Sequence, residues 1–273
     1  MPNANIKQSI KVILGVCLVC SFFVSTAAVW LNSIQQQNRR LDRIGNILSV
    51  AGLAGHRKNI EQIYRDRIVP VMIDLASGER VEPRRFDDVL NIENFDIETL
   101  ASDSDYGVAI PPEQDIAKIK RRPRYMVVYL VKKDNRFDQV ILPVYGKGLW
   151  STMYGFLALN NDLNTIAGIT FYQHGETPGL GGEIENPKWQ QSWRGKRAFN
   201  SAGEVIIEVV RGEVEANSPD AKHQIDSLSG ATLTSRGVDN LIHYWLGEHG
   251  YGPLLDRLRQ GSLADLTAAG KQE

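Results

Sequence analysis

The sequence predicts an α+β protein: one membrane-spanning helix followed by a domain with a mainly antiparallel sheet and packing helices. A long uncharged apolar run near the N-terminus indicates the span. Short β-type segments from residue 125 onward indicate the sheet, and helical periodicity near residue 240 indicates a packing helix. With 42% hydrophobic and 23% charged residues, the 273-residue chain can form a sizeable core.

The first element is the apolar run 12–31, which has no charged residue and is about as long, at roughly 20 residues, as a bilayer-crossing helix. Trp30 lies near its far end, where tryptophan commonly anchors at the membrane interface. The small residues 25–28 also fit the cleavage site of a signal peptide. Because the apolar run continues past them, a retained transmembrane helix over residues 12–33 is favoured.

Charge leaves the orientation of this helix open. Lys7 and Lys11 precede the span, and Arg39, Arg40 and Arg43 follow it, so neither side has the clear excess of cations that marks the cytoplasm. Long domains also cross membranes with little regard to flanking charge.

The cysteines and the net charge exclude several kinds of site. Cys17 and Cys20 both lie in the apolar run, where we interpret them as two small apolar residues, with an iron centre shared between subunits as the alternative. The rest of the chain has no thiolate, and no metal site is expected. A formal net charge of −1 gives no basic field for nucleic acid, which is not expected as a partner.

The region that follows the span, residues 34–120, is predicted to be helical and irregular. A helix should continue beyond the membrane on apolar residues at three- and four-residue steps and end at two glycines: Leu41, Ile44, Leu48 and Ala51, then Gly52 and Gly55. A short helix is expected on Ile60, Ile63 and Tyr64, before Pro70. Charged, proline and turn residues over 74–123 indicate irregular structure with one or two short elements.

Residues 121–252 are predicted to form the sheet domain. Its expected strands are rich in β-branched and aromatic residues: Tyr125–Val131, Val140–Val144, Gly155–Leu159, Thr165–Tyr172 and Val205–Val210. Most are joined by short turns, such as the charged turn 132–138, which favours antiparallel pairing.

The clearest helix closes this domain. Its apolar residues recur with helical spacing: Val238, Leu241, Ile242, Trp245 and Leu246. Gly247 and Gly250 mark its end. Residues 253–273 are expected to form a C-terminal tail.

Three segments are rich in glycine and polar residues: GKGLWSTMYG at 146–155, HGETPGLGG at 174–182 and DSLSGATLTS at 226–235. Glycine lets a ligand approach the main chain closely. None of the segments matches a P-loop, a dinucleotide-binding loop or a nucleophile elbow. The third segment precedes the closing helix, where its hydroxyls could serve a phosphate site or simply cap the helix.

Residues 226–232, DSLSGAT, resemble the recognition motif of flavin transferases, which attach FMN through its phosphate to a threonine hydroxyl. Nearly the whole chain resembles the family of the C subunit of the Na+-translocating NADH:quinone reductases and, more distantly, the G subunit of the Rnf electron-transport complex. The resemblance rests on the N-terminal anchor, NILSVAGL at 46–53 and the three glycine-rich segments. It implies that residues 121–252 bind FMN covalently.

The resemblance also implies site residues. Thr232 would carry the phosphoester. The transferase would chiefly read Asp226, Ser229, Gly230 and Ala231. One wall of the flavin site would consist of Glu176, Thr177, Gly179, Leu180 and Gly181, and a second wall of Leu149, Trp150, Ser151 and Thr152. His174 is interpreted as a hydrogen-bonded loop residue, ahead of a direct proton role, and Trp189 and Trp193 as packing residues.

Family membership implies a subunit of a Na+-translocating NADH:ubiquinone reductase that passes electrons through covalent FMN while other subunits oxidise NADH, reduce quinone and conduct Na+. It places the chain in a bacterial inner membrane, with residues 1–11 cytoplasmic, a single span and a periplasmic domain. A flavin transferase would act during maturation. Two alternatives stay open: an Rnf-type subunit, which the long insert near 57–120 disfavours, and a membrane-tethered, non-redox binding module.

Overall fold

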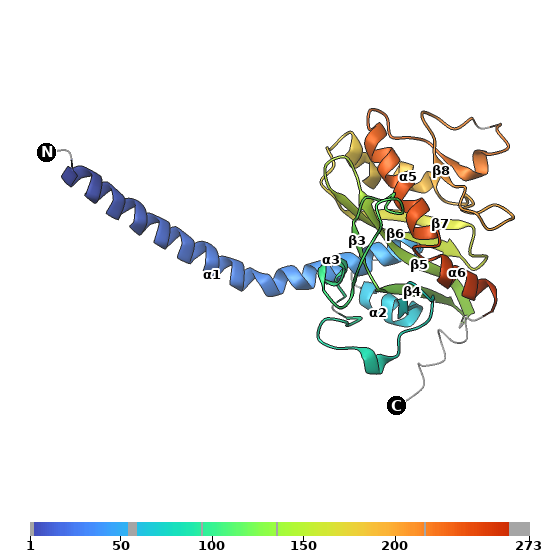
Figure 1. Cartoon of the computed structure of the whole chain (residues 1–273), viewed down its shortest axis with the longest axis horizontal. Helices are drawn as coiled ribbons and strands as arrows, with labels where there is room; N and C mark the ends of the chain where they lie inside the picture. The colour runs from blue at the N-terminus through green and yellow to red at the C-terminus, as the bar shows by residue number, and fades with distance from the viewer. Residues whose placement is uncertain (1–2, 54–58, 94, 135, 216, 262–273) are drawn as a thin grey trace. The chain divides into compact units, whose positions relative to one another are not determined.

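The computed structural model describes residues 3–53, 59–93, 95–134, 136–215 and 217–261. The chain consists of two compact units, Met1–Arg43 and Ile44–Glu273. The chain path is coloured from blue to red in Figure 1.

The described part of the first unit lies within helix α1 (Asn3–Val50), the long blue helix of Figure 1. Its stretch Gln8–Leu31 is long and apolar enough to cross a membrane. The large apolar side chains of this stretch are exposed, Trp30 by 77%. A helix of a soluble core would bury such residues, so their exposure agrees with the expected membrane segment. Cys17 and Cys20 lie here with free thiols.

The last turns of α1 belong to the core of the second unit. Ile47, Leu48 and Val50 are buried. The helix ends where Gly52 adopts a φ of 71°, as the sequence predicts, whereas Gly55 lies outside the described residues. Thr170 donates a hydrogen bond to Asn46 Oδ1 at 3.3 Å and so ties the sheet to this end of α1.

A five-stranded antiparallel sheet forms the centre of the second unit, in the order β1-β4-β5-β6-β7. Its strands are β1 (Ile68–Asp74), β4 (Tyr125–Lys133), β5 (Arg136–Lys147), β6 (Thr152–Asn160) and β7 (Ile166–Gln173). In the register, Ile141 pairs with both Tyr129 and Ala158. The four strands β4 to β7 confirm the predicted antiparallel sheet and the α+β class.

Strand β1 was not predicted. It lies before residue 120, where the preceding region was expected to end, so the sheet includes a strand from outside the predicted sheet domain. Pro70 lies within it and pairs with Tyr129. A proline cannot donate to a ladder and is therefore confined to edge strands, which is where β1 lies. Val71, Met72 and Ile73 are buried.

Two helices pack on the sheet through main-chain carbonyls of β5. On α5 (Thr232–Leu246), Trp245 Nε1 donates to the Tyr145 carbonyl at 2.7 Å. Just before α6 (Gly252–Arg259), the Tyr251 hydroxyl donates to the Pro143 carbonyl at 2.7 Å. Helix α5 confirms the predicted closing helix. Helix α6 was not predicted. Its leucines are buried, so the first part of the expected tail 253–273 packs in the core. Residues 262–273 lie outside the described part.

The remaining elements are short: α2 (Ile60–Arg67), η2 (Pro83–Arg85), α3 (Ile97–Ser102), β2 (Gly107–Ala109), β3 (Arg121–Pro123), η3 (Gly181–Glu185), α4 (Pro187–Ser192), β8 (Glu208–Val209), η4 (Ala221–His223) and β9 (Gln224–Ile225). The strand predicted at 205–210 was wrong in extent: Glu208–Val209 form β8, which pairs in parallel with β9, and Val205 forms an isolated bridge with Phe199. The Val209 N–H donates to Asp239 Oδ1 at 2.8 Å, which holds this segment beside α5.

Removal of residues 1–33 should yield a soluble, cooperatively folding domain. The second unit begins at Ile44, and the described part of the chain contains no further helix that could span a membrane. Fractionation without detergent, followed by thermal unfolding, would measure this. A deletion of residues 1–50 is the control and should be less stable, because it removes buried Ile47 and Leu48. Aggregation of the shorter deletion would contradict the expectation.

Candidate functional site

The three glycine-rich segments meet at one buried carboxylate, that of Glu176. This residue is only 5% exposed. Its Oε1 accepts hydrogen bonds from the N–H groups of Trp150 at 2.9 Å and Ser151 at 3.2 Å. Its Oε2 accepts from the Leu149 N–H at 3.2 Å and from the Thr234 hydroxyl at 2.6 Å. The first, second and third segments are thus joined through a single side chain.

Glycine is required around this carboxylate because there is no space for a side chain. A Cβ at Gly148 would lie 2.5 Å from Glu176 Oε1, and one at Gly181 would lie 2.5 Å from the Thr234 hydroxyl. At both distances the hydrogen-bonded Glu176 or Thr234 side chain would have to shift. The glycines of the first two segments therefore have a packing role at the point where the segments meet.

Burial alone raises the pKa of the Glu176 carboxyl, but the hydrogen bonds from Thr234 and from the main chain of residues 149–151 outweigh it, and the pKa lies below the ordinary 4.5. The group is therefore ionised at neutral pH. A buried charge is tolerated when donors surround it, as here. Because the same four donors occupy the carboxylate oxygens, Glu176 is not available to bind a ligand. Its role is to hold the three segments in position around the site.

The first segment is the turn between β5 and β6. The Gly148 N–H donates to the Ser151 carbonyl at 2.8 Å, which closes the turn. The Ser151 hydroxyl accepts from the Gly175 N–H at 2.5 Å and so joins this turn to the second segment. Leu149 and Trp150 point into solvent, Trp150 with 66% of its surface exposed. Thr152 begins β6 and is partly exposed.

The second segment folds into a tight turn around the Thr177 carbonyl, which accepts N–H bonds from Leu180 at 3.1 Å and Gly182 at 2.9 Å. Gly179 has a φ of 75°, a conformation that favours glycine. The turn leaves the Leu180 side chain exposed.

His174 is a hydrogen-bonded loop residue, in agreement with the interpretation from sequence. Its Nδ1 accepts from the Glu176 N–H at 3.1 Å, and its Nε2 lies 3.0 Å from Glu185 Oε1. Trp189 and Trp193 are also packing residues: both are buried, and their rings meet edge to face at 5.6 Å between centroids.

The third segment is held at its start and is open at its end. Asp226 Oδ1 accepts from the Val214 N–H at 2.6 Å, and the Asp226 carbonyl accepts from Trp189 Nε1 at 2.9 Å. Gly230 has a φ of 71°, and a Cβ there would lie 3.1 Å from Leu180 Cδ2, so the second and third segments touch at this point.

The hydroxyl groups of the third segment differ in accessibility. Thr234 and Ser235 are 1% and 3% exposed, and both are engaged: Thr234 with Glu176, and Ser235 as acceptor from the Leu228 N–H at 2.9 Å. Thr232 and Ser229 are exposed. Neither hydroxyl has a hydrogen-bond partner in the part of the chain that the structure describes. Thr232 does not cap α5, because the N-cap position is Ala231, without any side-chain cap.

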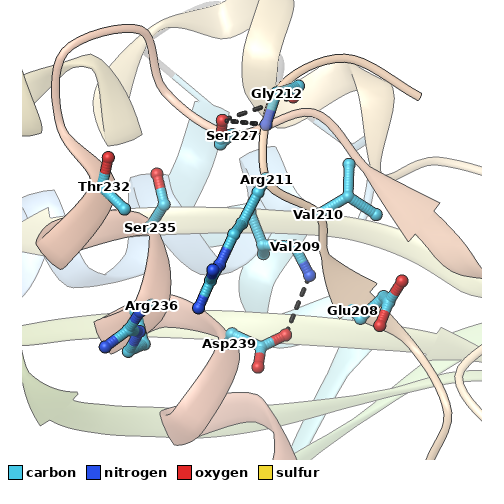
Figure 2. Close-up of a pocket in the computed structure, with 10 residues that line it drawn as sticks. All are labelled: Glu208, Val209, Val210, Arg211, Gly212, Ser227, Thr232, Ser235, Arg236 and Asp239. Carbon is cyan, nitrogen blue, oxygen red and sulfur yellow. Dashed lines mark hydrogen bonds between the residues drawn. The ribbon is translucent and has the colours of Figure 1, made fainter.

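A cavity of about 460 Å³ lies beside Thr232 (Figure 2). Its lining comes from the segment around β8, from the start of the third segment and from the first turns of α5: Glu208, Val209, Val210, Arg211, Gly212, Ser227, Thr232, Ser235, Arg236 and Asp239. Apart from Thr232, none of these residues was assigned to a site from the sequence. The closing helix was predicted from Val238 onward, whereas α5 begins at Thr232, so the prediction did not place Arg236 on the same helix face as Thr232.

The cavity and the predicted flavin walls lie on different sides of the first turn of α5. Successive residues of a helix are about 100° apart, so Thr234 points away from the face that Thr232, Arg236 and Asp239 share. Thr234 is directed at Glu176 and hence at the first two segments. The contacts of Glu176 and Gly181 with Thr234, and of Leu180 with Gly230, bring the predicted walls to the start of α5, on the side opposite the cavity.

Comparison with known proteins identifies the family of the chain. A family model described as FMN-binding domain matches residues 148–247, which include most of the three segments and α5. The C subunit of the Na+-translocating NADH-quinone reductase from Pseudomonas aeruginosa is 48% identical over 257 residues, covering 93% of this chain and 96% of that protein. The same subunit from Yersinia pestis is 46% identical over 265 residues, covering 96% of each.

Solved structures show the same fold. The crystal structure of NqrC from Shewanella oneidensis matches with a TM-score of 0.74 at 33% identity, covering 82% of this chain and 99% of that one. The C subunit from Parabacteroides distasonis matches with a TM-score of 0.62 at 27% identity, covering 82% and 96%. The chain therefore belongs to the family of the C subunit of the Na+-translocating NADH-quinone reductases, which are oxidoreductase complexes, and it contains an FMN-binding domain.

Proposed function

We propose that this chain carries FMN joined by a phosphoester to Thr232 and transfers electrons through it within a Na+-translocating NADH:ubiquinone reductase. The observation that carries the proposal is the Thr232 hydroxyl, which is exposed on the first turn of α5 and is not engaged by the described chain. The FMN-binding domain that spans this turn supports the identity of the cofactor.

Burial favours Thr232 over its neighbours as the acceptor. A phosphoester forms only on a hydroxyl that a transferase can reach, and Thr234 and Ser235 are buried and engaged. Ser229 is the exposed competitor, but it lies in the loop before α5. Thr232 is the first residue of the helix, where free N–H groups and the helix dipole stabilise a phosphate.

Exposed apolar side chains support the placement of the flavin ring against the first two segments. Leu149, Trp150, Leu180 and Leu233 are among the few large apolar residues that the second unit leaves exposed. A bound aromatic ring would remove part of this surface from water, at roughly 25 cal/mol per Å². Thr177 and Gly179 would act by shaping the turn that presents Leu180, and Glu176 by fixing the turn that presents Leu149 and Trp150.

When bound, FMN would supply the redox chemistry, and the protein would supply position and environment. Asp226, Gly230 and Ala231 shape the loop that leads to Thr232. NADH oxidation, quinone reduction and Na+ conduction are assigned to partner subunits, as the names of the relatives imply a complex. The candidate span lacks the ionisable interior groups that ion paths use.

Thr232→Ala should abolish covalent FMN and leave the fold intact. An exposed threonine without a capping bond contributes little to stability, about 0.5 kcal/mol at most. Mass spectrometry of peptides from the chain, produced together with a flavin transferase, should place an FMN increment less one water on Thr232. Ser201→Ala, at an exposed residue outside the three glycine-rich segments, is the control and should keep the increment. Covalent flavin on Ser229, or its persistence in Thr232→Ala, would contradict the assigned site.

We also propose that the second unit lies on the periplasmic side of a bacterial inner membrane, with residues 1–11 in the cytoplasm. A reporter enzyme that is active only in the cytoplasm, fused after Glu273, should then be inactive, and one that is active only in the periplasm should work. The opposite pattern would reverse the orientation. Fusions that lack residues 1–33 should make the cytoplasmic reporter active and so serve as the control.

A further inference from the structure

The cavity beside Thr232 is lined by two arginines that form no ion pair within the described residues. Arg211 and Arg236 both line it and are both exposed at its surface. Within the described residues, neither guanidinium forms an ion pair or a hydrogen bond. Like charges at one cavity repel each other, and an anion between them would relieve that repulsion.

The two arginines come from different parts of the chain and are held by different means. Arg236 lies on α5, four residues after Thr232, and therefore on the same helix face. Arg211 follows β8, and the next residue is fixed to the third segment: the Gly212 N–H donates to the Ser227 hydroxyl at 3.0 Å, and the Ser227 N–H donates to the Gly212 carbonyl at 2.9 Å. Figure 2 shows the Arg211 side chain reaching across the cavity toward α5.

The acidic residues of the cavity have other partners. The Asp239 carboxylate accepts from the Val209 N–H at 2.8 Å, and burial raises its pKa. The Glu208 carboxylate accepts from Gln224 Nε2 at 2.9 Å. The cavity is thus lined by two arginines, the Thr232 hydroxyl and two carboxylates that are hydrogen-bonded to neutral donors, and no carboxylate of the described chain is in ion-pair contact with either arginine.

We propose that Arg211 and Arg236 form a clamp for the phosphodiester that would join FMN to Thr232, with the cavity as its seat. Guanidinium groups bind phosphate oxygens through paired N–H donors and do so more strongly than neutral donors. The inference rests on the proposed attachment site and extends it to two residues that the three glycine-rich segments do not contain. Both would hold the linker, and neither would take part in the redox step.

The experiment compares the melting temperature of the full chain in detergent with and without covalent FMN. The variants are Arg211→Gln and Arg236→Gln, and Arg84→Gln on η2, away from the cavity, is the control. In flavin-free protein, each clamp substitution should leave the melting temperature unchanged or raise it, since it removes repulsion. In flavin-bearing protein it should lower the melting temperature by about 3 °C, since it removes a charge-assisted hydrogen bond. Arg84→Gln should shift both forms equally.

Equal shifts in the two forms for Arg211→Gln and Arg236→Gln would overturn the clamp and leave the attachment proposal standing. If the wild-type chain bears no covalent flavin in its mass spectrum, the attachment proposal fails, and inorganic phosphate at constant ionic strength becomes the probe. The clamp then predicts a rise in melting temperature for the wild type and Arg84→Gln that is lost in both clamp variants. Equal rises in all four proteins would overturn it.

Discussion

The arrangement around the start of α5 depends on the buried carboxylate of Glu176. Removing a carboxylate from water costs several kcal/mol unless hydrogen-bond donors replace the water. Here the donors are the Thr234 hydroxyl and three consecutive N–H groups at 149–151. Because they come from segments separated by 25 residues or more in the sequence, the charge is stabilised only when all three segments are in place.

This constraint also determines what the site exposes. With Thr234 directed at Glu176, the helical phase of α5 turns Thr232 outward and places Arg236 and Asp239 beside it. With the N–H groups of residues 149–151 directed inward, the side chains of Leu149 and Trp150 face solvent. The proposed attachment residue, the apolar surface for a flavin ring and the charged cavity thus follow from one set of inward-pointing contacts.

Much of the fold was predictable from the sequence. Runs of β-branched and aromatic residues separated by turns indicate buried strands, and apolar residues at helical spacing indicate the buried face of a helix. Strand β1 escaped prediction because Pro70 is rare in strands, and α6 because it follows directly after glycines that end α5. At 205–210 the sequence has strand composition, but strand pairing depends on the neighbouring segment, and here only Glu208 and Val209 pair with β9. Glycine content located the three segments. The burial of the Glu176 carboxylate and the cavity beside Thr232 both depend on contacts between residues that are far apart in the chain. A single sequence does not reveal such contacts.

The most direct test of the central role of Glu176 is the free energy of unfolding of wild type and Glu176→Gln as a function of pH, with exposed Glu113→Gln as control. At neutral pH, Glu176→Gln should be less stable by about 2 kcal/mol, because an amide cannot accept four hydrogen bonds and leaves buried donors unpaired. The folded-state pKa of Glu176 is lowered, so its contribution is complete above 4.5 and is lost as the pH falls through the folded-state value. The difference between wild type and Glu176→Gln should therefore shrink in acid, whereas a small difference that does not vary with pH would contradict the account.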